Sequence, residues 1–368
     1  METYDIGSLP FEGDFAKFLK GTEGIDPLLA LLHPSDTSES GHYFEEKVVE
    51  GYIQKVQTGI DVSNYPQFRD MNQMFLDMFS GIEKTTAGYV SKGDIRIRAD
   101  RTEIPEVTAL KNNARYISEK TGRPLRLKIC VTGPYTLASS FSDRRSELFT
   151  MLADSIAKVV EANAFLGKYG GVEIVSAEEP LFGLVDDSLL DFGSEGRESL
   201  LHAWERVFGA AKVRDAQTAY HLHSTANELF WDVESVDIVE SHVDDALYGS
   251  SKTRILLEKK DKLLKASIAV TIFDNLLWQY FARNEHGTEA EILEKIGSTW
   301  TSIRKGVQPP LQFFESVETM RARLREIVRL VGAERVVYAG PECGLRSFPT
   351  YDSALELLRR VSTAAHTV

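Results

Sequence analysis

The chain has 368 residues, of which 43% are hydrophobic and 26% are charged, and its formal net charge at pH 7 is −13. This length and composition can bury a large core, and we expect one domain that spans residues 1–368. The negative charge argues against nucleic acid as a partner. The sequence has no apolar run of about 18 residues, so we expect no membrane partner. It starts without signal-peptide features, which predicts a cytoplasmic protein.

Short apolar or β-branched runs alternate with longer amphipathic stretches along the chain. The runs are residues 3–8, 56–62, 125–132, 171–177, 218–223, 236–241, 266–272 and 335–339. The amphipathic stretches include residues 44–57, 71–82, 144–166, 200–213 and 317–331. This alternation predicts βα units around a parallel sheet, and eight strands favour an α/β fold of the (β/α)8 TIM-barrel type with elaborated loops. A doubly wound sheet is the alternative.

Polar residues fall at the carboxyl ends of these predicted strands. They are Ser8, Glu178, His223, Glu240 and Cys343. In a TIM barrel the carboxyl ends of the strands form the active-site face. The distribution therefore favours the barrel and indicates where its site lies.

His221 and His223 stand two residues apart in a predicted strand, so both side chains leave the same face. With Glu240 and Cys343 they supply the nitrogen, oxygen and sulfur donors that zinc accepts in a tetrahedral shell. The alternative is that the two histidines are ordinary polar residues of a strand and that Cys343 is a small buried hydrophobe. The remaining histidines, His242 among them, have no such spacing, and we expect them in solvated or core positions.

Six short elements resemble, in the same order, the C-terminal catalytic domain of cobalamin-independent methionine synthase, whose wider superfamily includes uroporphyrinogen decarboxylase. The resemblance covers nearly the whole chain. The elements are residues 6–10 (Ile-Gly-Ser-Leu-Pro), 59–62 with 69–71, 132–137 (Thr-Gly-Pro-Tyr-Thr-Leu), 178–180 (Glu-Glu-Pro), 236–240 and 341–346 (Pro-Glu-Cys-Gly-Leu-Arg).

The resemblance implies zinc-dependent methyl transfer to a thiol such as homocysteine, because a thiol that binds zinc loses its proton and becomes nucleophilic. It implies His221, Glu240 and Cys343 as zinc ligands, with no catalytic residue beyond the metal site. The implied substrate-binding residues are Glu178 for an ammonium group, Ser8 with the backbone around Gly7 and Ile6 for a carboxylate, and Tyr65 in the substrate-binding segment.

The chain departs from the family pattern in three places. His223 stands where the family has a cysteine, and we predict that it is a fourth zinc ligand. Tyr65 stands in the segment where the family has a substrate-binding glutamate, and it cannot supply that charge. The chain also has the length of the short core form, which is associated with a methylated corrinoid donor, so a corrinoid, a corrinoid protein or a folate can each be the methyl donor.

Two other functions remain open. A uroporphyrinogen-decarboxylase-like lyase would need an arginine-rich mouth, whereas the predicted strand ends carry mainly acids and histidines. A non-catalytic barrel that binds a corrinoid or a protein partner would have lost its zinc site. A metal assay separates both from the methyltransferase.

Overall fold

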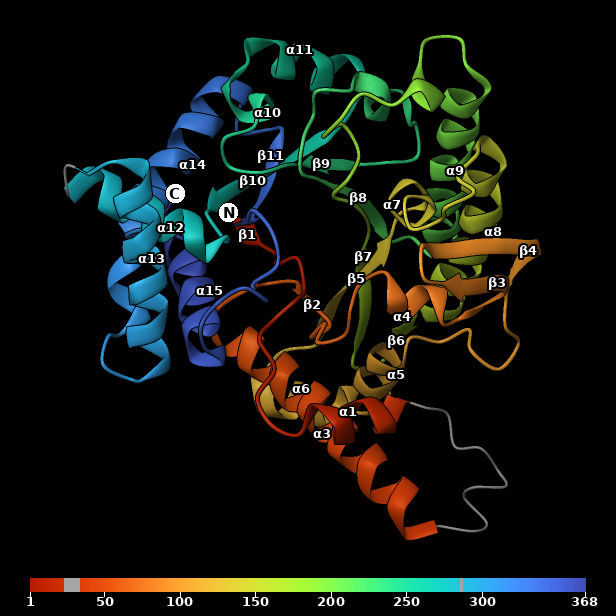
Figure 1. The fold of residues 1–368 in the computed structure, drawn as a ribbon, viewed down its shortest axis with the longest axis horizontal. Helices are drawn as coiled ribbons and strands as arrows, with labels where there is room; N and C mark the ends of the chain where they lie inside the picture. The colour runs from red at the N-terminus through yellow and green to blue at the C-terminus, as the bar shows by residue number, and fades with distance from the viewer. Residues whose placement is uncertain (23–33, 285–286) are drawn as a thin grey trace.

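A curled, mostly parallel sheet forms the centre of the computed structural model, which describes residues 1–22, 34–284 and 287–368 (Figure 1). The strand order is β1–β11–β10–β9–β8–β7–β5–β2. The bounds are β1 Glu2–Thr3, β2 Ser63–Asn64, β5 Leu125–Thr132, β7 Gly170–Glu179, β8 Gln217–Leu222, β9 Ile238–Glu240, β10 Leu263–Ala269 and β11 Val336–Pro341. The short strand β6 (Leu166–Gly167) adds to β7 in antiparallel direction, and β3 (Phe79–Thr85) with β4 (Gly88–Ile97) forms a separate hairpin.

Helices surround the outside of the curled sheet (Figure 1). They are α1 Phe15–Thr22, α3 Pro34–Gln57, α4 Gln73–Leu76, α5 Pro105–Asn112, α6 Ala114–Thr121, α7 Pro134–Ala138, α8 Ser146–Asn163, α9 Glu195–Lys212, α10 Ala246–Gly249, α11 Ser251–Lys259, α12 Phe273–Asn284, α13 Glu289–Arg304, α14 Val317–Val331 and α15 Tyr351–Ala365. Short 3-10 helices lie at Ser188–Leu190, Glu228–Asp232 and Pro310–Phe313. No helix in the described part of the chain is both long enough and apolar enough to cross a membrane.

The sequence pattern of α14 explains how such a helix covers the sheet. Met320, Leu324, Ile327 and Val331 are buried, and their spacing of three and four residues places them on one face of the helix. The hydroxyl of Ser316 accepts a hydrogen bond from the backbone N–H of Thr319 and caps the amino-terminal end. Apolar helix faces of this kind pack on the outer face of the sheet and form the main core.

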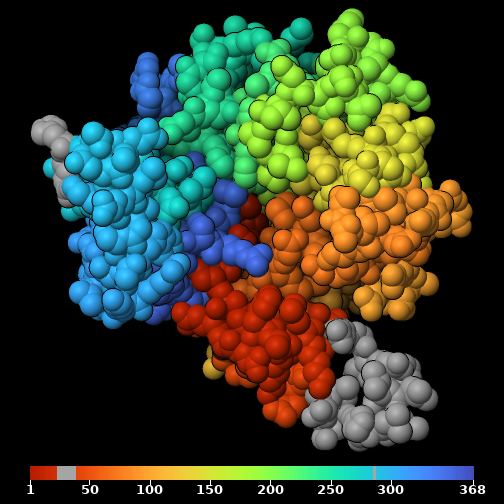
Figure 2. All heavy atoms as spheres, in the orientation of Figure 1, coloured from red at the N-terminus to blue at the C-terminus, as the bar shows by residue number. Residues whose placement is uncertain are grey.

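The inner face of the sheet carries a second, smaller group of buried apolar side chains. It consists of Tyr4, Ile6, Val62, Ile174, Ala219, Ile238 and Tyr338. The next residues along two strands, Val175 and Tyr220, belong to the main core, because successive side chains of a strand point to opposite faces. The interior of the curl is therefore packed, as in barrels of the TIM type. Figure 2 shows a hollow near the centre of one face, where N-terminal residues in red are visible.

The two edges of the sheet meet without a continuous ladder. Single parallel bridges join Tyr4 to Val62 and Ser8 to Gln67, beyond the ends of β1 and β2. Asp61 strengthens this seam, because its carboxylate accepts hydrogen bonds of 2.8 Å from both the backbone N–H and the hydroxyl of Thr3. The result is a TIM-like α/β fold whose sheet curls round but does not close as a regular barrel.

Strands are present close to the predicted positions, and β5 has the predicted bounds. The prediction for residues 56–62 was wrong in its bounds, because α3 continues to Gln57 and β2 begins at Ser63. In α3 the buried residues continue the helical spacing up to the end of the helix, at Val48, Val49, Tyr52 and Lys55. The predicted helix at residues 71–82 was also mostly wrong, since only Gln73–Leu76 is helical and the β3–β4 hairpin starts at Phe79.

Candidate functional site

Four side chains gather at the carboxyl ends of the strands β8, β9 and β11. One donor atom from each of His221, His223, His242 and Cys343 lies within 4.8 Å of the others. The sulfur of Cys343 is 3.4 Å from Nε2 of His223, and the rings of His223 and His242 have centroids 4.0 Å apart. We call these four residues the donor cluster.

The local structure explains why these residues meet. His221 belongs to β8, and His223 follows two residues later on the same face, so that their ring centroids are 5.3 Å apart. His242 lies two residues beyond the end of β9, and Cys343 lies two residues beyond the end of β11. Parallel strands bring these segments to the same edge of the sheet although they are distant in sequence.

Two histidines of the donor cluster, His221 and His242, have buried ring nitrogens without hydrogen-bond partners among the described residues. His221 is 2% exposed, and neither of its ring nitrogens has a hydrogen-bond partner among the described residues. Nε2 of His242 is also buried and without a partner in the described part of the chain. Leaving buried polar atoms unpaired is costly, so these nitrogens are suited to a ligand that accepts their lone pairs.

Burial also sets the protonation of the donor cluster. It lowers the pKa of His221 well below its usual value and that of His223 to about 3, and it raises the pKa of the Cys343 thiol to about 12. The imidazoles are therefore neutral at pH 7, which is the form that binds metals. The thiol stays protonated unless a metal displaces its proton.

The donor set fits zinc. Three imidazole nitrogens and one sulfur are ligand types that zinc accepts, and bonds of ~2.0–2.3 Å at tetrahedral angles place donors roughly 3.3–3.8 Å apart. The cluster, with donor atoms within 4.8 Å of one another, is slightly wider than such a shell. Small side-chain rotations would be enough to close it.

Glu240, the predicted carboxylate ligand, lies beside the donor cluster and not in it. It is fully buried and forms an ion pair with the equally buried Lys265 of β10. Its Oε1 accepts a hydrogen bond of 3.1 Å from the hydroxyl of Tyr4 and lies 3.9 Å from Nδ1 of His221. The carboxylate is therefore engaged below the cluster, inside the sheet.

Glu178, the predicted ammonium-binding residue, is engaged in a similar way. Its register neighbour on β8 is His221, and Nε2 of His221 lies 3.8 Å from its Oε2. Oε1 of Glu178 accepts hydrogen bonds from Ser176 at 2.5 Å and from the ammonium of Lys128 at 3.4 Å. The ammonium groups of Lys128 and Lys265 lie 5.4 and 5.3 Å from the ring centroid of Tyr4, so a charge-balanced layer lies beneath the histidines.

The other predicted substrate-binding residues differ in how deeply they are buried and in how close they lie to the segment of Cys343. Ser8 lies beside the segment that carries Cys343, because its backbone oxygen accepts a hydrogen bond of 2.8 Å from Leu345. Gly7 lies against the side chain of Asn64, and Ile6 is 6% exposed in the inner apolar group. Tyr65 is fully buried, and its hydroxyl donates to the backbone oxygen of Cys130 at 2.9 Å.

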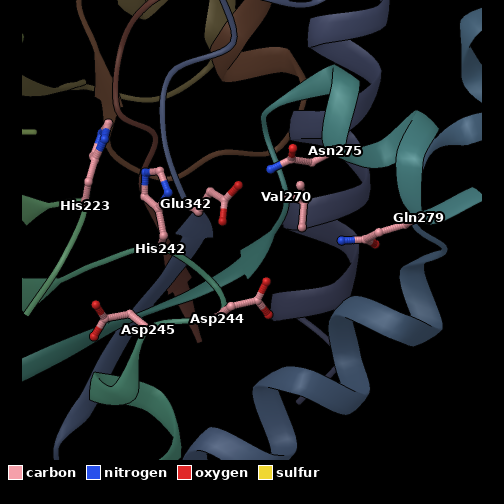
Figure 3. Close-up of a pocket in the computed structure, with 8 residues that line it drawn as sticks. All are labelled: His223, His242, Asp244, Asp245, Val270, Asn275, Gln279 and Glu342. Atoms are coloured by element: carbon pink, nitrogen blue, oxygen red, sulfur yellow. The ribbon is translucent and has the colours of Figure 1, made fainter. Parts of the chain in front are cut away.

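A cavity of about 290 Å³ opens beside the donor cluster (Figure 3). Its lining residues are His223, His242, Asp244, Asp245, Val270, Asn275, Gln279 and Glu342. Figure 3 shows the side-chain amides of Asn275 and Gln279 pointing into this space from α12, and the carboxylate of Asp244 facing the same space. Two amides and one exposed carboxylate offer partners for the carboxylate and ammonium groups of a small amino acid.

Two lining residues hold the loop that carries His242. The carboxylate of Glu342 accepts hydrogen bonds of 2.9 Å from the backbone N–H groups of Val243 and Thr271. Asp245 accepts from the backbone of Thr225 at 2.9 Å and from Leu247 at 2.7 Å. Because these carboxylates accept hydrogen bonds from backbone N–H groups, they hold the loop of His242 in place and do not face a ligand.

The spacing rule that found His221 and His223 could not find His242, Lys128 or Lys265. His242 stands two residues after Glu240, to which the ligand role was assigned, and only strand pairing brings it to the other two histidines. A signal for the lysines was present, since Lys128 and Lys265 interrupt apolar runs of buried strands, where an unpaired ammonium is not tolerated. Each required an acidic partner inside the sheet.

Comparisons with known proteins bear on the fold. No family model matches the chain, and no curated protein matches it. The chain is similar to the solved structure of a B12-independent methionine synthase from Shewanella sp. W3-18-1 in complex with selenomethionine, with a TM-score of 0.61, 15% sequence identity, and coverage of 99% of this chain and 96% of that chain. This similarity supports the TIM-like α/β fold.

A putative sugar phosphate isomerase/epimerase from Anabaena variabilis is a weaker structural neighbour. Its TM-score is 0.42 with 11% identity, and the alignment covers 100% of this chain and 97% of that chain. Because the overlap is this low, no functional argument rests on it.

Proposed function

We propose that the chain is a zinc-dependent methyltransferase that moves a methyl group to a small thiol such as homocysteine, as a methionine synthase does. The proposal treats the curled sheet as a (β/α)8 barrel with its site at the carboxyl ends of the strands. The observation that carries it is the donor cluster, in which buried imidazoles without hydrogen-bond partners stand next to a thiol. The motif resemblance and the fold of the Shewanella protein support it.

The size and lining of the neighbouring cavity support a small acceptor. Its volume of about 290 Å³ is just below the usual range for ligand pockets, roughly 300–1,000 Å³, which suits an amino acid better than a tetrapyrrole. Asp244 has no hydrogen bond or ion pair to another described residue, so we assign it the ammonium group. Asn275 and Gln279 would donate hydrogen bonds to the carboxylate of the substrate.

Bound zinc would supply a position at which a thiol loses its proton at neutral pH. The chain's own residues orient that thiol and exclude water, since His221 closes the site from below and is buried. In the transfer, a lone pair of the sulfur forms the new bond to carbon, and the bonding pair of the donor stays with the donor. The proton of the thiol passes to solvent. A methylated corrinoid, free or carried by a protein, and a methylated folate are the candidate donors.

The test begins with metal analysis of protein that is purified without chelator, for which we expect about one zinc per chain. Adding homocysteine should then release about one proton per zinc and add a sulfur to the metal shell, as X-ray absorption would report. Methyl transfer is assayed with methylcobalamin and with a methylated folate as donors. A chain that neither contains nor takes up zinc would rule the proposal out, and zinc binding without a response to any thiol would favour a non-catalytic barrel.

A further inference from the structure

The ion pair between Glu240 and Lys265 restricts what Glu240 can do. Both side chains are fully buried, and Tyr4 donates a hydrogen bond to the same carboxylate. If Glu240 turned toward a metal, it would leave the ammonium of Lys265 unpaired in the interior, which is strongly unfavourable. The carboxylate is therefore held by its partner in the sheet.

Lys265 cannot follow Glu240 toward the donor cluster. Its ammonium also donates to the backbone oxygen of Pro341 at 2.5 Å and lies 3.4 Å from the hydroxyl of Ser267. These contacts tie it to the ends of β10 and β11. The pair consequently stays below the cluster.

His242 occupies the position that Glu240 leaves. It stands two residues further along the same segment, so the period of an extended chain directs both side chains to one side. Its ring lies 4.0 Å from that of His223, and its Nε2 is buried without a partner among the described residues. Glu342 and Tyr248 fix the loop on both sides of it, since they bind the backbone N–H groups of Val243 and Ser241.

We propose that the metal shell of this chain consists of His221, His223, His242 and Cys343, and that Glu240 lies outside it as the counter-ion of Lys265. This inference rests on the proposed function only in requiring that the cluster binds zinc. Zinc with three neutral imidazoles and one thiolate carries one net positive charge, whereas a shell with Glu240 in place of one imidazole is neutral. With four protein ligands, the substrate thiolate would enter as a fifth ligand, and the positive charge of the shell favours such an anionic acceptor.

The experiment compares zinc affinities by competition with a chromophoric chelator. His242→Ala should weaken zinc binding about 10-fold or more, as loss of a ligand requires. The double variant Glu240→Gln with Lys265→Met removes both charges together, avoids an unpaired ammonium and should bind zinc within a few-fold of the original chain. His202→Ala, an exposed histidine of α9, is the control for removing an imidazole away from the site.

X-ray absorption at the zinc edge of the unaltered chain provides a measurement that needs no variant. We expect one sulfur and three imidazoles, recognised by scattering from the outer ring atoms. A zinc site with only two imidazoles would overturn this shell. Unchanged zinc affinity in His242→Ala, together with loss of zinc in the double variant, would overturn it as well. Both outcomes would leave the methyltransferase proposal intact. Zinc binding with this shell but no response to thiols would overturn the methyltransferase while leaving the shell intact.

Discussion

His223 is the residue at which the chain departs most clearly from the methionine synthase motifs that it resembles, because a histidine stands where those motifs have a cysteine. Its Nε2 lies 3.4 Å from the sulfur of Cys343. We predict that His223→Ala lowers zinc affinity on the order of 10-fold or more, while His223→Cys retains the metal because sulfur is also a zinc ligand. Chelator competition measures both, and His202→Ala serves again as the control. Unchanged affinity in His223→Ala would make this residue a bystander.

Glu342 offers a test of positioning without removal of a ligand. Its two carboxylate oxygens bind Val243 and Thr271, so that the loop bearing His242 is tied to the end of β10. Glu342→Gln replaces one acceptor oxygen by a donor that faces a backbone N–H, and we expect zinc affinity to fall roughly 10-fold. The measurement is the same titration, with circular dichroism to confirm the fold.

Asp244→Asn is the matched control for Glu342→Gln. Asp244 lines the same cavity and has a similar charge, but its carboxylate holds no backbone group in the described chain. Zinc affinity should be nearly unchanged, whereas KM for an amino-acid thiol should rise. Equal losses of zinc affinity in the two variants would mean that the negative charge of the cavity, and not the position of the loop, determines zinc affinity.

At the scale of elements, the seam between the first and second strands depends on Asp61. Burial raises the pKa of this carboxyl, but hydrogen bonds from His366 and Thr3 outweigh it, and the pKa is lowered. A lowered pKa in the folded state stabilises the protein above the unfolded value of ~3.9, and this contribution is lost as the pH falls through the folded value. We predict that Asp61→Asn reduces the free energy of unfolding near pH 7 and that the difference from the original chain shrinks below about pH 4.

Urea denaturation at a series of pH values measures this difference. Asp94→Asn is the control, since Asp94 is exposed in the β3–β4 hairpin and its only ion pair within the described residues is with Arg96 of the same strand. Its effect should be small at every pH, because exposed ion pairs contribute little. An Asp61 effect that does not change with pH would mean that shape, and not charge, holds the seam.

Some elements were predictable because their local pattern agrees with their environment. Strand β5 is mostly apolar and is buried on both faces, and the extended segment of β8 and His223 places two histidines on one face. The start of β2 was not predictable, since Val56 is β-branched yet belongs to the last turn of α3. The role of His242 depends on which strands are neighbours, and the partner of Glu240 depends on Lys265 across the sheet. Neither the role of His242 nor the partner of Glu240 can be predicted from the spacing of residues along the sequence.

At the scale of the whole molecule, the donor cluster joins strands that are far apart in the chain, from His221 to Cys343. A ligand that binds only the folded chain stabilises it in proportion to the logarithm of its concentration, by about 2.7 kcal/mol at 100 times the dissociation constant. We predict that zinc raises the temperature of unfolding and that a chelator reverses the increase. Calorimetry measures the shift, and Cys343→Ala should reduce it strongly.

The pairing of β1 with β11 also has a consequence for how the chain is made. Glu2 and Thr3 pair with Tyr338 and Ala339, so β1 acquires this neighbour only after all the residues between them have been synthesised. Until then β1 is held by isolated bridges to the segment around β2, by the hydrogen bonds of Thr3 to Asp61 and by the ion pair of Glu2 with Arg126, and the edge of the growing sheet at β10 stays unpaired. Such open edges are sites of wrong association between chains. The time between translation of β1 and translation of β11 is therefore the period in which a nascent copy is most vulnerable to aggregation.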